Sequence, residues 1–115
     1  MATLAEMEIR QPERNGREVT VEIRFDGEIH LDGPYDPFWV SKRDNEEVRW
    51  ILKGGDGKFL VDFGHDSPFY ESQFSQDSPV SGLVRRNVLP NSGRLYKYSV
   101  WVSGKKLDPG GGVKP

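Results

Sequence analysis

The sequence predicts an all-β domain, a single antiparallel Greek-key β-sandwich, on three observations. Runs of alternating apolar and polar residues recur along the chain, which is the period-two pattern of half-buried strands. Turn signals rich in glycine, proline, asparagine and aspartate separate these runs at short intervals. No segment carries apolar residues at helical spacing. A length of 115 residues suits one domain over 1–115, with 1–6 and 108–115 as candidates for flexible ends.

The first clear strand lies in "REVTVEIRF", where Val21 and Ile23 share one face and Glu22 lies on the other. Asp26 and Gly27 then lead to "EIHL", and Asp-Gly between alternating runs is a strong signal for a tight hairpin. Upstream, "MEIRQ" is expected to form another strand, followed by a turn in "ERNG". The N-terminal part is thus expected to consist of strands joined by tight turns.

A second group of strands follows the break "GPYDP" at 33–37. "FWVSK" is expected to be a short strand, and "EEVRWILK" alternates with Val48 and Trp50 on one face. The second face of that run is partly apolar, so the strand is expected to be central or partly covered. After the turn "GGDG", the run "KFLVDF" resumes with Val61 inward and Asp62 outward.

Between 64 and 93 the alternation stops in a stretch rich in serine, proline, glycine, asparagine and aspartate. A loop of this length without structure of its own is uncommon in a compact domain. Its apolar residues are therefore expected to anchor it as short strands or turns. These residues are Phe69, Phe74, Val80, Leu83, Val84, Val88 and Leu89.

The clearest strand of the chain is "RLYKYSVWVSG". The face expected to be buried carries Tyr96, Tyr98, Val100 and Val102. Trp101 faces the other way, and we expect the long loop or the N-terminal strand to cover it. The tail "KKLDPGGGVKP" offers at most one weak terminal strand at Val113.

Composition excludes several classes of partner and chemistry. The 16 basic and 18 acidic side chains are interspersed, without the basic stripe of a nucleic-acid binder. No apolar run approaches the roughly 20 residues that cross a bilayer. The chain has no cysteine, which excludes disulfides, thiolate nucleophiles, iron–sulfur clusters and thiolate-ligated copper. With no signal peptide in the first residues, the expected location is cytoplasmic, and no cofactor is expected.

Three motifs resemble the cupredoxin-like β-sandwich family over roughly residues 37–115. "EEVRWIL" leads through a hairpin to "KFLVDFG", and after the long loop comes "LPNSGRLYKYSV". The last of these is similar to the Pro-x-Gly turn and aromatic strand that deliver copper ligands in cupredoxins. The tail "LDPGGGVKP" resembles the closing segment of small family members that carry no metal.

The resemblance implies the family's fold but not its electron-transfer chemistry. A blue-copper site needs a cysteine thiolate, two histidines and a weak axial ligand. This chain has no cysteine, and after the aromatic strand it has neither histidine nor methionine. Only His65 lies in the neighbourhood of the family's first histidine ligand. One histidine cannot hold such a copper ion.

His65, Asp66 and Ser67 have the residue types of a hydrolase triad, but they are consecutive in the chain. Neighbouring side chains of an extended segment point to opposite faces, whereas a triad needs them to converge. The sequence also lacks a GxSxG elbow. A metal site that combines His65 with Asp62 or Asp66 is a further alternative, and a surface loop histidine is the simpler interpretation.

The leading hypothesis is a non-catalytic, metal-free binding or interaction module with a protein partner. Loops on rigid β-sandwiches carry most recognition, which favours the aromatic residues of the long loop. The candidate contact residues are His65, Asp66, Phe69, Tyr70, Phe74 and Trp101. Two alternatives stay open: a metalloprotein or small hydrolase using His65 with Asp62 or Asp66, and an immunoglobulin-like assembly module joined through an edge strand.

Overall fold

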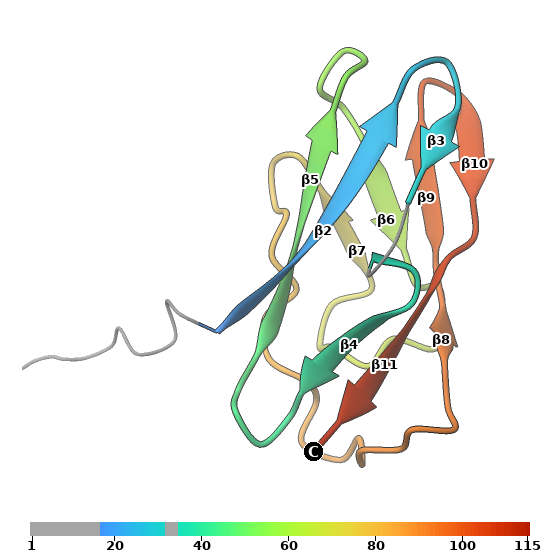
Figure 1. Cartoon of the computed structure of the whole chain (residues 1–115). Helices are drawn as coiled ribbons and strands as arrows, with labels where there is room; N and C mark the ends of the chain where they lie inside the picture. The colour runs from blue at the N-terminus through green and yellow to red at the C-terminus, as the bar shows by residue number, and fades with distance from the viewer. Residues whose placement is uncertain (1–16, 32–34) are drawn as a thin grey trace, which may run out of the picture.

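The structure is a computed structural model that describes residues 17–31 and 35–115 (Figure 1). The strand expected in "MEIRQ" lies outside the described residues. All regular elements of the described residues are β-strands, so the predicted all-β class is confirmed. The strands form three sheets that face one another across a common core (Figure 1).

One sheet has the strand order β3-β2-β5. It consists of β2 (Glu18–Phe25), β3 (Ile29–His30) and β5 (Glu47–Lys53). β2 and β3 pair as the predicted antiparallel hairpin around Asp26 and Gly27. β2 and β5 pair in parallel along their length. The predicted inward faces are confirmed, because Val21, Ile23, Val48 and Trp50 are buried.

A second sheet has the order β4-β11-β8, with β4 (Phe38–Ser41), β11 (Gly110–Lys114) and β8 (Tyr96–Lys97). β11 runs parallel to β4 and antiparallel to β8. The prediction of an antiparallel fold is therefore wrong for two strand pairs, β2 with β5 and β4 with β11. Alternation within a strand reports which face is buried but not the direction of the neighbouring strand.

The third sheet is antiparallel throughout and has the order β10-β9-β6-β7. Its strands are β10 (Lys105–Leu107), β9 (Ser99–Val102), β6 (Leu60–Asp62) and β7 (Gln73–Ser75). The inward-facing residues of this sheet complete the core from the opposite side. They include Val61, Phe74, Val100 and Val102.

The aromatic strand and the C-terminal tail form one bent hairpin that belongs to two sheets. Its upper part is β9 with β10, and its lower part is β8 with β11, in the same register. The bend falls at Tyr98 and Pro109, where the Tyr98 N–H donates to the Pro109 carbonyl at 3.1 Å. Pro109 has no N–H to return a second bond, so the ladder is interrupted where the strands change sheets.

The tail therefore forms more strand pairs than the single weak terminal strand that the sequence predicted. β11 is the middle strand of its sheet, and Val113 is buried. The missed signal is the turn of Ser103 and Gly104, which have φ of 49° and 80°. Positive φ at both central residues is the geometry of a two-residue hairpin turn.

The core is built around Trp50. Its ring centroid lies 5.1 Å from that of Phe74 and 6.5 Å from that of Phe69. Phe69 is 1% exposed and Phe74 is 2% exposed. Both residues belong to the core, so their rings are not exposed as a contact surface would require. They close the core because the long loop brings them back against β5 and β6.

The long loop is anchored largely as predicted. Phe69 forms a bridge with Val84, and both are buried together with Phe74 and Val88. Leu83 and Leu89 are exposed instead, so the prediction that they anchor the loop is wrong. A composition-based expectation could not separate these two from their buried neighbours, because the loop has no repeating face.

Candidate binding surface at the loop end

Segments 64–72 and 85–94 meet at one end of the molecule and form what we call the loop-end surface. Segment 85–94 runs along the lower end in Figure 1, just before β8. The two segments are joined by backbone and side-chain contacts. The Arg85 N–H donates to the Pro68 carbonyl at 2.8 Å, and Arg94 forms an ion pair with Asp66. These contacts bring His65, Asp66 and Tyr70 to one surface.

The consecutive His65, Asp66 and Ser67 do not converge. Ser67 Oγ donates to the Glu71 carbonyl at 2.7 Å and accepts the Phe69 N–H at 3.1 Å, which closes a turn. The Asp66 carboxylate is bound to Arg94. His65 is exposed and makes no hydrogen bond or ion pair with the rest of the described chain. A hydrogen-bonded relay needs these groups in one line, and their partners lie apart.

Asp62 also has structural partners. Its carboxylate accepts the Gly64 N–H at 2.8 Å and the side-chain amide of Gln73 at 3.3 Å. This arrangement caps the turn that follows β6. Within residues 17–31 and 35–115, no three histidine, aspartate or glutamate side chains lie close enough together to hold a metal ion.

Tyr70 is the aromatic residue of the loop that solvent reaches, with 66% of its surface exposed. Its hydroxyl accepts the Arg86 N–H at 3.0 Å, which ties the ring to the second segment. Leu89, on that same segment, is 76% exposed. The loop end thus presents an anchored aromatic ring and an exposed aliphatic side chain.

A hollow of about 450 Å³ opens between the two segments, and we call it the arginine hollow. Arg85, Arg94 and Asp66 line it together with Leu89 and Tyr96. The Arg94 guanidinium lies over the Tyr96 ring, 4.3 Å from its centroid. Such a cation–π contact holds the charged group in place. A second hollow of about 330 Å³, lined by His65 and Tyr70, shares Arg85 as a wall.

Lys42 supports the loop end from the turn that follows β4. Its Nζ donates to the carbonyls of Arg86 at 2.6 Å and Val88 at 2.5 Å. Sequence reasoning missed Lys42, Arg85 and Arg94. No local pattern relates a lysine to backbone carbonyls more than forty residues later, because the contact exists only after folding.

Trp101 lies elsewhere, on the outward face of β9 between Leu60 of β6 and Lys106 of β10. It is 40% exposed, so the expectation that the long loop covers it is wrong, while the strand expected in "MEIRQ" lies outside the described residues. The Lys106 Nζ lies 5.5 Å from the centroid of the indole ring. Trp101 is therefore a candidate for a separate contact rather than a part of the loop-end surface.

Tyr98 is the titratable group that the core perturbs most clearly. Burial raises the pKa of its hydroxyl, and a hydrogen bond from Trp50 Nε1 at 3.4 Å opposes that shift only partly. The hydroxyl therefore stays neutral at physiological pH. It lies in the core beside Phe38 and Phe63 and acts as a packing group.

Comparison with protein-family models, curated proteins and solved structures gives no match to this chain. The described part of the chain contains no helix with the length and apolar content that crossing a bilayer would require.

Proposed function

We propose that the protein is a non-catalytic, metal-free binding module that recognises a protein partner through its loop-end surface. The observation that carries this proposal is the exposed Tyr70 ring, whose hydroxyl is tied to the Arg86 backbone. A side chain that is already fixed loses little conformational freedom when it binds. Tyrosine and arginine are also the residue types that contribute most at protein interfaces.

We further propose a cupredoxin-like β-sandwich for the fold. Its support is the sequence resemblance, together with sheets that face one another across one aromatic core. The proposal includes a Greek-key connection of the strands and membership of the cupredoxin-like family. A rigid sandwich with loops at one end is a common scaffold for recognition.

The hydrolase and metalloprotein alternatives find less support in the contacts. Asp62, Asp66 and Ser67 each have partners that stabilise turns or join loops. The assembly alternative would use a free strand edge, and β10 is one of the two edge strands of the four-stranded sheet, with β7 as the other. β10 carries Lys105 and Lys106, and lysine on an edge strand opposes pairing with another sheet.

The test is affinity capture from the source cells with quantitative mass spectrometry. We expect the wild-type protein to capture a defined partner that the double variant Tyr70→Ala, Leu89→Ser loses at least about tenfold. Trp101→Ala is the control, because it removes an exposed aromatic ring from a different surface. Equal capture by the double variant, or equal loss with the Trp101 control, would contradict the proposal.

A further inference from the structure

We infer that the partner of the loop-end surface presents a short acidic segment, one of whose carboxylates replaces Asp66 on Arg94. This inference rests on the proposed function, because it names the chemistry of the partner that the module binds. It starts from the charge of the arginine hollow. The hollow is lined by two arginines, Arg85 and Arg94, and by one carboxylate, Asp66.

The positive charge is local rather than general. Segment 85–94 also contains Arg86, and the Lys42 ammonium group lies against this segment, where it donates to the carbonyls of Arg86 and Val88. The whole chain, in contrast, has a net charge of −2. A cationic hollow on an acidic protein attracts a short anionic segment, whereas the rest of the surface opposes a long polyanion such as nucleic acid.

Contacts within the chain fix the orientation of both guanidinium groups before a ligand binds. Arg94 lies over the Tyr96 ring, and Arg85 donates from Nε to the Ser67 carbonyl at 3.0 Å. These contacts and the pairs with Asp66 and Asn87 leave further N–H groups on each guanidinium for an incoming oxygen. A planar guanidinium that is already oriented suits a carboxylate through two parallel hydrogen bonds.

Asp66 indicates which anion fits. Its carboxylate already occupies Arg94 from within the chain, so this guanidinium is positioned for a carboxylate. The side chains of Asp66 and Arg94 are 64% and 47% exposed. An exposed ion pair contributes little to stability, so a partner's carboxylate can displace it. The Asp66 carboxylate therefore competes with the partner's carboxylate for Arg94, and we call it the internal competitor.

The surroundings favour a peptide over a free anion. Leu89 lines the hollow and is exposed, and Tyr70 lies on the neighbouring segment. These side chains can contact the apolar residues of a peptide, whereas inorganic phosphate would leave them uncovered.

The test measures fluorescence anisotropy with a labelled acidic pentapeptide that has a phenylalanine at its centre. We expect it to bind more tightly at low salt than at physiological salt. A matched peptide with glutamine and asparagine in place of the acids should not bind. Arg94→Gln should weaken binding about tenfold or more, because it leaves the ligand carboxylate unpaired.

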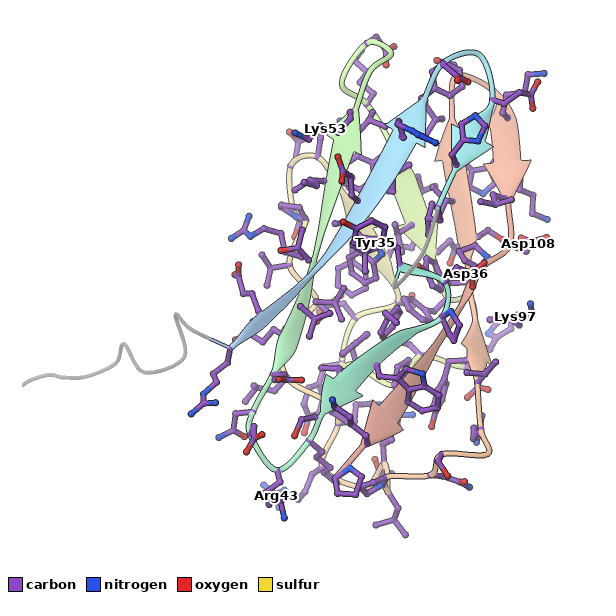
Figure 2. The ribbon with its side chains drawn as sticks, in the orientation of Figure 1. Tyr35, Asp36, Arg43, Lys53, Lys97 and Asp108 are labelled. Carbon is purple, nitrogen blue, oxygen red and sulfur yellow. The ribbon has the colours of Figure 1, made fainter. Side chains whose placement is uncertain are left out.

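The decisive variant is Asp66→Asn. Removal of the internal competitor should tighten binding by a few-fold, since a larger fraction of Arg94 is free to accept the peptide. Lys53→Gln is the matched control, because it removes a cation at the opposite end of the molecule from Arg43 and the loop end (Figure 2). We expect this control to leave binding unchanged.

Several outcomes would overturn the inference: unchanged or weaker binding with Asp66→Asn, equal binding of the amide peptide, or equal loss with Lys53→Gln. Displacement of the peptide by inorganic phosphate at comparable concentration would instead indicate a free-anion site. Absence of peptide binding, combined with partner capture that depends on Tyr70, would reject the acidic ligand and leave the proposed function standing. Partner capture that is unchanged when Tyr70 and Leu89 are substituted would reject the proposed function itself.

Discussion

At the scale of single residues, the glycines of β11 determine how closely two aromatic rings approach its backbone. A Cβ at Gly111 would lie 2.1 Å from the ring of Phe38, and one at Gly112 would lie 2.2 Å from the ring of Trp39. The rings cover the strand from opposite faces, because successive residues point to opposite sides. The glycine run, which lies in the end 108–115 that was expected to be flexible, is a packing site.

We expect Gly111→Ala to destabilise the fold by roughly 1–3 kcal/mol, since the added methyl group overpacks against the buried Phe38 ring. Urea unfolding followed by tryptophan fluorescence measures the change. Gly93→Ala is the control, because its Cβ would meet only the Asn91 side chain at 3.4 Å. Similar losses for both variants would show that glycine flexibility, not the ring contact, is responsible.

A second residue-scale prediction concerns Asp26 and His30, whose Oδ1 and Nε2 atoms lie 2.9 Å apart. The hydrogen bond from His30 is the main reason why the pKa of Asp26 is lowered from its ordinary value of 3.8. A carboxyl whose pKa is lowered by folding contributes stability above its unfolded pKa. That contribution is lost as the pH falls below about 3.8 and through the folded pKa.

We therefore expect His30→Ala to raise the pKa of Asp26 toward 3.8. An NMR titration of the Asp26 carboxyl carbon measures this pKa in both proteins. The stability difference between them should be largest above pH 3.8 and should shrink in more acidic solution. Superimposable titration curves would show that His30 does not hold the carboxylate.

At the scale of the elements, the long loop belongs to the core at some positions and to the surface at others. Phe69 packs on Trp50 and Phe38, while the next residue, Tyr70, faces solvent. Backbone bonds explain why the segment stays in place. Ser81 N–H donates to the Val48 carbonyl at 2.7 Å, so part of the loop lies along the edge of β5.

This division predicts unequal effects for two neighbouring substitutions. Phe69→Ala should destabilise the protein by roughly 3–5 kcal/mol, because it leaves a cavity in the aromatic cluster. Tyr70→Ala should cost less than about 1 kcal/mol, since the ring is exposed. Chemical denaturation of both variants tests the difference. Equal destabilisation would mean that both rings are buried in solution.

At the scale of the whole molecule, the described residues combine one aromatic core with an end surface rich in arginine and aromatic side chains. The core packs around Trp50 and its aromatic neighbours. The bent hairpin links two of the three sheets covalently and by hydrogen bonds. It therefore couples the loop end to the rest of the fold.

We expect protein purified without chelator to contain less than stoichiometric copper or zinc, and EDTA to leave its melting temperature unchanged. Elemental analysis and thermal unfolding measure the two quantities. His65→Ala serves as the check on a hidden site. Stoichiometric metal that is lost in this variant would replace the binding module with a metalloprotein.

Sequence patterns predicted the parts of the fold that depend on local chemistry. The Asp26 and Gly27 hairpin and the buried faces of β2, β5 and β9 follow from turn preferences and from alternation. The parallel pairs and the middle position of β11 could not be predicted, because they depend on which distant strands meet. The same holds for the candidate site, where Asp66 was identified but its partner Arg94 was not.

The sequence by itself thus determined an all-β chain with an aromatic core and without any thiol chemistry. These properties follow from composition and from short-range periodicity, which act within a few residues. The tertiary structure decided which loop aromatics are core and which are surface, and it brought Arg94 to Asp66. The physical reason is that burial and ion pairing depend on contacts between segments far apart in the chain, and no local pattern encodes those contacts.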